Sequence, residues 1–566
     1  MSYTSFVYDI SEIEKLTVGT IDVIVALFFD GTQNNRNNTN AKQKYVHLKE
    51  RNIKKGASIE EEKQAQAYDD YGNKDDDSYE NDLSNIARLE AYYPKLESED
   101  CVTDSIYIEG IGTEDYQRDQ VHILYGASSN GVAMGAGRTG IRGKVRIGCE
   151  KLADKCLKII KKGKRKKAIN CLTIDVFGFS RGAAAARNFI HEVTRQDGIK
   201  YDNGIGGVDG QYYWPSSDEI PPHGFLGFFL KQKNVTINRI CIRFVGLFDT
   251  VLSYDPNGHF SASFNTGARN KAVVEGLHLN AINKARRVVH LVAADEYREN
   301  FPLTDIRSMG TVTVEHNLFH NIYRIPCANF HTSVAGSKAL QLSFPGAHSD
   351  IGGGYVEGNI EYVDEILNGD IEKLKQKKET LWKSGWFKEK ELTVHSFKRK
   401  LSGRRRLSNK YSYILLHIMC EFGVKFGIPF RQNSLENEYE LRLTSTASSD
   451  GKLRNITLSE DNILIRTKQR LYKYAFDNYT QPYVFNPFIE DEYKDLDKHY
   501  AGSKIPEKRF AEYRQKKQEL QEQLDLKRLR NEFLHWSSNF DWIGMDPVTI
   551  TVDGKTDYGE RVILPG

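Results

Sequence analysis

The chain has 566 residues, of which 39% are hydrophobic and 27% are charged, and this balance excludes disordered and fibrous proteins. The formal net charge of +3 is close to neutrality, so no nucleic-acid partner is expected. The seven cysteines are odd in number and form no Cys-x-x-Cys pair, which favours reduced thiols over a disulfide framework or a metal site.

The start of the chain, MSYTSFVYDISEIEKLTVGT, has no basic segment followed by an apolar stretch. This composition predicts synthesis in the cytoplasm without a signal peptide. A run of roughly 18 apolar residues, the length of a membrane-spanning helix, is also missing. If the protein acts outside its own cytoplasm, we expect it to leave by a route that reads no such signal.

Apolar, β-branched runs recur along the first 360 residues and predict strands buried on both faces, as in a parallel sheet. Helical or loop stretches separate these runs, which favours an α/β fold with a mostly parallel sheet and helices on both faces. The predicted strands cover residues 21–29, 105–111, 171–177, 239–247, 288–293 and 340–344, with helices at 145–160 and 183–189.

We divide the chain into an N-terminal arm (1–19), a catalytic domain (20–360) and a mainly helical C-terminal region (361–566) that packs on or covers the catalytic domain. The catalytic domain carries a polar insertion at about 36–82 and a candidate lid at about 205–235. Within the lid, the apolar cluster HGFLGFFL (223–230) is interpreted either as a lipid-contacting surface or as a buried helix.

The segment CLTIDVFGFSRGAAAARNF contains a G-x-S-x-G motif at Gly178, Ser180 and Gly182. An apolar run leads directly into the motif and an alanine-rich helix former follows it. A strand, a sharp turn and a helix in this order are typical of the nucleophile elbow of α/β-hydrolases. The motif therefore predicts Ser180 as a nucleophile, with Gly178 and Gly182 relieving crowding around the turn.

A serine hydroxyl needs a base and an orienting acid, which follow the serine in the order acid, then histidine in this fold. Asp249 ends the apolar run RICIRFVGLF and is the predicted acid, with Asp295 as the runner-up by the same reasoning. His348, on a glycine-rich loop after the last predicted strand, is the predicted base. His331 and His320 are the alternatives.

The reaction also requires donors for the oxyanion. We predict the backbone amide of Arg181, just after the nucleophile, and an amide of Gly31 or Thr32 in the loop after the first strand. No metal or cofactor is expected. A formal G-x-G-x-x-G match at residues 135–140 lacks the preceding strand and the following acidic residue of a dinucleotide site.

A series of segments resembles the motifs of the first class of type VI secretion lipase effectors, which are bacterial α/β-hydrolases with phospholipase A activity. In order, these are FFDGTQNN, SNIARLEAYYP, YIEGIGT, FGFSRGAAAAR, FVGLFDTV, DEYRENF and FPGAHSDIGGGY, and near the end LHWSSNF and RVILPG. The resemblance implies that Ser180, Asp249 and His348 form the catalytic triad. It also implies a membrane phospholipid substrate, delivery by the type VI spike or an adaptor into a rival bacterium's periplasm, and a cognate immunity protein.

The sequence thus predicts an antibacterial phospholipase that hydrolyses acyl esters through an acyl-enzyme. Two alternatives stay open, since a fold does not determine an activity. One is an esterase for soluble esters, and the other is a non-enzymatic module that binds a lipid or a partner on a hydrolase scaffold.

Overall fold

The computed structural model describes residues 4–5, 19–50, 58–72, 78–120, 137–162, 168–195, 221–252, 276–309, 315–317, 322–325, 339–365, 370–441, 463–477, 483, 485–486, 489–500, 507–539, 546–552, 555–558 and 561–564.

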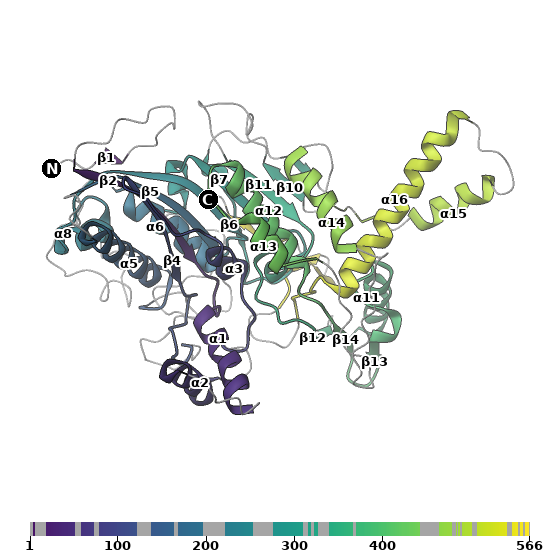
Figure 1. The fold of residues 1–566 in the computed structure, drawn as a ribbon. Helices are drawn as coiled ribbons and strands as arrows, with labels where there is room; N and C mark the ends of the chain where they lie inside the picture. Colours follow the sequence, from purple (N-terminus) through teal and green to yellow (C-terminus); the bar gives the residue numbers. More distant parts are fainter. Residues whose placement is uncertain are drawn as a thin grey trace.

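A ten-stranded sheet forms the centre of the molecule (Figure 1). Its strands follow the order β3-β4-β2-β5-β6-β7-β11-β10-β9, with β1 pairing β6. The strands from β4 to β11 in this order are parallel, and β3, β10 and β9 add antiparallel edges. The bounds are β1 (Thr4–Ser5), β2 (Thr20–Phe29), β3 (Leu96–Glu97), β4 (Cys101–Ile108), β5 (Ala168–Phe179), β6 (Ile237–Phe248), β7 (Arg287–Ala293), β9 (Glu315–Asn317), β10 (Ile322–Ile325) and β11 (Ala339–Phe344).

All six strands predicted from apolar runs are present, and the predicted α/β fold is confirmed. The second strand begins and ends earlier than predicted, and Glu109 and Gly110 lie in the loop that follows it. Successive side chains of a strand point to opposite faces, so a strand with apolar residues at every position must be covered on both sides.

Helices cover both faces of the sheet. Side chains of β2 such as Val23, Val25 and Leu27 belong to a core on one face that also contains side chains of α5 (Ile141–Lys161), α6 (Arg181–Val193) and α8 (Gly224–Gln232). The alternate residues Ala26 and Phe28 join a second core on the opposite face. Helices of this second core include α3 (Asn85–Ala91), α10 (His348–Gly352) and α12 (Tyr411–Lys425).

The apolar cluster at 223–230 forms α8, and its side chains Phe225, Leu226, Phe229 and Leu230 are buried in the first core. Of the two interpretations of this cluster, the buried helix is therefore correct. The rest of the candidate lid, residues 205–220, lies outside the described residues.

The described part of the polar insertion after β2 is mainly helical. It contains α1 (Arg36–Tyr45), a π-helix (Val46–Glu50) and α2 (Ile59–Tyr71). The two α-helices pack around a small core of their own that includes Ala41, Tyr68 and Tyr79.

The C-terminal region is mainly helical, as predicted, but it also contains small antiparallel sheets. The strands β12 (Ile360–Glu365), β14 (Lys400–Arg406) and β13 (Leu392–His395) form one, and β15 (Thr549–Val552) with β16 (Lys555–Tyr558) another. The helices are α11 (Ile371–Lys383), α12, α13 (Gln432–Glu438), α14 (Ile463–Tyr472), a π-helix (Lys473–Asp477), α15 (Ile489–Tyr500) and α16 (Glu507–Glu532). In Figure 1, α15 and the start of α16 project from the body.

Three-residue 3-10 helices lie at Arg307–Met309 and Glu389–Glu391, with a longer one at Leu279–Lys284. The last strand, β17 (Ile563–Leu564), pairs in parallel with β8 (Leu303–Thr304), a short strand after β7. No helix in the described part of the chain combines the length and the apolar character needed to cross a membrane.

Candidate active site

Ser180 occupies a sharp turn between β5 and α6. Its backbone has φ 59° and ψ −131°, a conformation that an L-residue adopts only when its surroundings enforce it. The Ser180 amide donates to Phe248 O on β6 (3.1 Å), and Ser180 O accepts from Ala183 N in the first turn of α6 (3.0 Å). These contacts hold a strand, a turn and a helix in the arrangement expected of a nucleophile elbow.

The two glycines of the motif are required by close backbone approaches. A Cβ atom on Gly182 would lie 2.1 Å from the carbonyl oxygen of Asp30 at the end of β2. A Cβ on Gly178 would lie 2.6 Å from Ala183 Cα. Glycine therefore lets the elbow approach both its own helix and the neighbouring strand.

The elbow lies where the connections of the sheet change direction. After β2 the chain continues to β4 on one side, whereas β5, β6 and β7 extend the sheet on the other side of β2. In open α/β sheets, the crevice at the carboxyl ends of the strands at such a point is the usual ligand site. The loop after β2 and the turn after β5 therefore face the same crevice.

The predicted acid and base are brought together at this edge. Asp249 follows the last residue of β6, with a φ of 40°, and His348 is the first residue of α10, shortly after β11. His348 Nδ1 lies 2.6 Å from Asp249 Oδ2. Since a carboxylate only accepts, the imidazole donates from Nδ1 and its Nε2 is left as the acceptor. The imidazole also packs on the ring of Phe179, next to Ser180, with 4.6 Å between ring centroids.

Asp249 is completely buried and accepts four hydrogen bonds. Besides His348, the donors are the Ala293 amide, 2.9 Å from Oδ1, and the two terminal nitrogens of Arg561, each 2.8 Å from one carboxylate oxygen. Burial alone would raise the pKa of Asp249, but Arg561 and His348 hold it well below its usual range. Asp249 is thus a fixed anion.

Asp295, the alternative to Asp249 as the acid, holds the turn before His348 and does not bond the imidazole. Its Oδ2 accepts from the Gly346 amide (2.8 Å) and its Oδ1 from the Tyr297 hydroxyl (3.3 Å). It thereby fixes the turn that precedes His348, and burial raises its pKa. The hydrogen bond to the imidazole belongs to Asp249 instead.

Two further buried carboxylates hold the backbone of the histidine loop. The amide of His348 donates to Glu296 Oε2 (3.2 Å), and the amide of Ala347 donates to Asp350 Oδ2 (2.8 Å). Asp350 in turn accepts from the amide and from Nδ1 of His535, at 2.8 and 2.7 Å. Burial lowers the pKa of His348, although Asp249 opposes the shift, so the resting imidazole is neutral.

The loop after β2 contacts the nucleophile elbow. Arg181 Nε donates to Thr32 Oγ1 (2.8 Å). The amide of Gly31, however, donates to Asp30 Oδ1 (2.7 Å), while the hydroxyl of Tyr107 donates to Asp30 Oδ2 (2.6 Å). The N–H of Gly31 is thus already engaged within its own loop, whereas Thr32 contacts the segment after Ser180 through its hydroxyl.

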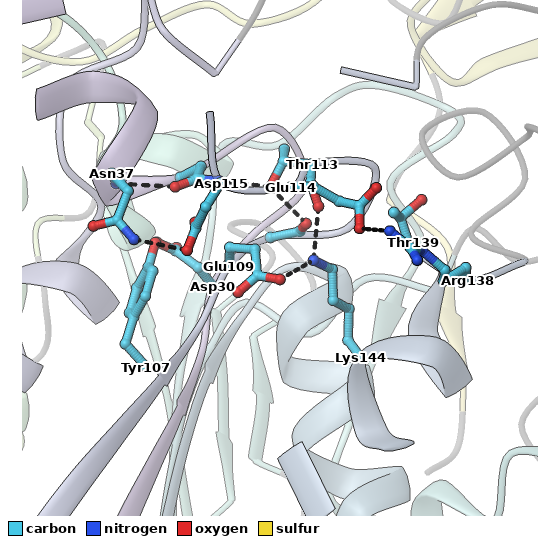
Figure 2. A network of polar contacts seen from close by, with 12 residues as sticks. Asp30, Asn37, Tyr107, Glu109, Thr113, Glu114, Asp115, Arg138, Thr139 and Lys144 are labelled. Atoms are coloured by element: carbon cyan, nitrogen blue, oxygen red, sulfur yellow. Dashed lines mark hydrogen bonds and ion pairs between the residues drawn. The ribbon is translucent and has the colours of Figure 1, made fainter. Parts of the chain in front are cut away.

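A polar network behind this loop joins it to the loop after β4 and to the start of α5 (Figure 2). Lys144 Nζ, completely buried, donates to Glu109 Oε1 (2.9 Å) and to Thr113 O (2.7 Å). Asn37 Nδ2 in α1 donates to Asp115 Oδ2 (2.9 Å). These bonds connect the loop after β4 to α5 and to α1, the helix that follows the β2 loop.

Several residues that build this site were missed by the sequence interpretation. Arg561, Glu296, Asp350 and His535 all contact the acid or the histidine loop. The sequence did offer a signal for them, because each of the four lies in a segment that resembles a family motif. These segments are DEYRENF, FPGAHSDIGGGY, LHWSSNF and RVILPG. The alternative bases, His320 and His331, lie outside the described residues. Among the residues that the structure does describe, no group of three or more His, Cys, Asp or Glu side chains could hold a metal ion.

Residues 24–368, more than half of the chain, match the model of the family described as "T6SS, Phospholipase effector Tle1-like, catalytic domain". No curated protein matches the chain. Among solved structures, the chain is similar to the Tle1 effector bound to the VgrG spike from the type 6 secretion system, with 17% identity over 99% of this chain and 98% of that chain and a TM-score of 0.42. It also matches an uncharacterized protein from Pseudomonas aeruginosa, with 16% identity, 91% and 65% coverage and a TM-score of 0.30.

Proposed function

We propose, given that this chain belongs to the Tle1-like phospholipase effector family of type VI secretion, that it hydrolyses the acyl esters of membrane glycerophospholipids through an acyl-enzyme on Ser180. The observation that carries the proposal is the 2.6 Å hydrogen bond between Asp249 and His348, whose imidazole packs on Phe179, the residue directly before Ser180 in its strained turn. A buried acid that orients a neutral imidazole beside a serine is the arrangement that activates a serine hydroxyl.

In the first half of the reaction, Ser180 Oγ attacks the ester carbonyl while His348 Nε2 accepts its proton. Asp249 stabilises the resulting imidazolium and keeps the ring in its orientation. The tetrahedral intermediate collapses as the imidazolium protonates the departing lysophospholipid oxygen. Water then attacks the acyl-Ser180 ester by the same route, which releases the fatty acid and restores the serine.

The negative charge on the intermediate needs fixed donors. We assign the amide of Arg181 as one donor, because it begins α6 directly after the nucleophile. The amide of Thr32 is the second, supported by the bond between the Thr32 hydroxyl and the Arg181 side chain. This bond ties the two donor-bearing segments together.

The family assignment also supports a biological setting for this reaction. We propose that a type VI spike or adaptor protein delivers the enzyme into the periplasm of a rival bacterium. There it degrades membrane phospholipid, and a cognate immunity protein protects the producing cell. The catalytic mechanism requires neither a cofactor nor a nucleic-acid partner.

The test compares the wild-type protein with Ser180→Ala on phospholipid vesicles and on a short-chain soluble ester. We expect the substitution to lower turnover of vesicles by about 10⁴-fold and to abolish labelling by a fluorophosphonate. Near-normal turnover in the variant would overturn the proposal. A wild-type protein that cleaves only the soluble ester would refute the lipid substrate but not the mechanism. Mass spectrometry of products from a lipid with two different acyl chains identifies the ester that is cleaved.

A further inference from the structure

We infer that Arg561, in the last segment of the chain, is a positioning residue of this active site that clamps the acid Asp249. The inference rests on the proposed serine hydrolysis and adds to it a residue from outside the matched catalytic domain, which ends at residue 368.

The contact between the two side chains is a two-pronged ion pair. The terminal nitrogens of the Arg561 guanidinium donate to the two oxygens of Asp249, both at 2.8 Å, and Nε donates to Phe301 O at 2.7 Å. A planar guanidinium that binds both oxygens fixes the plane of a carboxylate as well as its position. The oxygen that accepts from His348 therefore has little freedom to turn away from the imidazole.

Arg561 is held in place by contacts that do not involve the acid. It directly precedes the segment that runs along β8, where Val562 O accepts from the Leu303 amide and Leu564 O from the Asp305 amide, both at 2.9 Å. Leu564 is buried in the core formed with α6. Removing the guanidinium alone should consequently leave the last strand docked.

The charge of Arg561 also bears on the base. The charged groups around His348 are Asp249 and Glu296, which favour its protonation, and Arg298, which opposes it. Arg561 is paired with Asp249 (2.8 Å), and Arg298 is paired with Glu296 (2.7 Å). On the other side of the loop, Asp350 is paired with His535 (2.7 Å).

Loss of Arg561 would leave the charge of Asp249 balanced by the imidazole alone. The pKa of His348 would then rise, because the protonated ring would be the only cation still hydrogen-bonded to the buried carboxylate. Since His348 must be neutral to accept the serine proton, the acid limb of the pH–rate profile should move to higher pH. A purely structural role for Arg561 predicts no such movement.

The experiment measures kcat, KM and the pH dependence of kcat/KM for Arg561→Gln and Arg561→Lys in the full-length chain. For Arg561→Gln we expect kcat to fall roughly 10- to 100-fold at little change in KM, and the acid limb to move up by about one pH unit. Arg561→Lys keeps the positive charge but cannot donate to both oxygens of Asp249 at once. Its acid limb should stay near that of the wild type, while its kcat takes an intermediate value.

The matched control is Arg243→Gln. Arg243 also forms a two-pronged pair with a buried aspartate, Asp175, at 2.8 and 2.5 Å, but that aspartate bonds the hydroxyl of Tyr93 and lies within β5. This variant should lose thermal stability to a similar degree and keep the wild-type kcat and acid limb. The control therefore distinguishes the effect of losing any buried ion pair from the effect of losing the contact that holds Asp249.

An Arg561→Gln variant with the kcat and acid limb of the Arg243→Gln control would overturn the inference while leaving the proposed function intact. If Arg561→Gln does not fold, the test relies on Arg561→Lys. A wild-type kcat in a folded Arg561→Lys variant would show that the two-pronged contact with Asp249 is not needed, which would overturn the inference. Failure of the proposed function is seen separately, as a wild-type protein that neither cleaves vesicles nor reacts with fluorophosphonate at Ser180.

Discussion

Replacing Asp249 by asparagine should inactivate the enzyme through the tautomer of the histidine. The carboxylate oxygen Oδ2 accepts from both His348 and Arg561. An amide nitrogen at this position would face two donors, since Arg561 cannot give up its proton. The imidazole can relieve its part of the conflict by moving its proton to Nε2. That nitrogen can then no longer accept the proton of the Ser180 hydroxyl.

The size of the effect follows from these contacts. Loss of the correct tautomer in a serine hydrolase lowers kcat by about 10⁴-fold, or roughly 5.5 kcal/mol in the activation free energy. Breaking one side of a buried ion pair lowers the free energy of unfolding by about 3–5 kcal/mol. The Asp249→Asn variant should therefore be much less active and measurably less stable than the wild-type protein.

The assay measures kcat on a chromogenic ester together with the thermal unfolding midpoint, with Asp295→Asn as the control. An asparagine at position 295 can still accept the Gly346 amide through its carbonyl oxygen, so kcat should stay within about threefold of the wild type. A larger loss of kcat in Asp295→Asn than in Asp249→Asn would refute the assignment of the acid.

Three further predictions concern the base, the elbow and the oxyanion loop. Burial lowers the pKa of His348 from its ordinary value of 6.5, and only the neutral imidazole accepts a proton. The value of kcat/KM should therefore rise with pH along an acid limb centred below pH 6.5. An acid limb centred above pH 6.5 would contradict this reasoning. Gly182→Ala places a Cβ 2.1 Å from the carbonyl oxygen of Asp30. The rate of ester hydrolysis should therefore fall about 10-fold or more, and the thermal unfolding midpoint should drop. Wild-type activity with an unchanged midpoint would show that the turn can relax around the added methyl group. Thr32→Val removes the acceptor of Arg181 Nε. Steady-state kinetics should show a kcat about 10-fold lower with little change in KM. An unchanged kcat would show that this contact does not contribute to catalysis.

Much of the candidate site could be predicted from the sequence because its signals are local. The run of apolar residues before Ser180 and the alanine-rich stretch after it predict a strand–turn–helix without reference to the rest of the chain. The same holds for Asp249, which directly follows an apolar run. The sequence favoured Asp249 over Asp295, but an apolar run precedes each aspartate, and only the position of the His348 imidazole shows which of the two bonds it.

The amide of Gly31 shows a second limit of the sequence interpretation. A loop after the first strand was correctly expected near the elbow, but the carboxylate of Asp30 takes up the Gly31 N–H. Which of two adjacent amides stays available depends on a side-chain rotamer and on Tyr107, a residue of the neighbouring strand. Such contacts have no counterpart in a local pattern.

By itself, the sequence determined which segments are strands, which residues end them and which side chains can carry a proton or a nucleophile. Apolar burial is non-directional, so it can be recognised in a run of residues without knowledge of its neighbours. Only the tertiary structure decided that β6 and β11 bring Asp249 to His348, and that the end of the chain returns to place Arg561 on the same carboxylate. Hydrogen bonds and ion pairs require their partners within about 3 Å in a fixed orientation, and for residues hundreds of positions apart only the folded chain sets that distance.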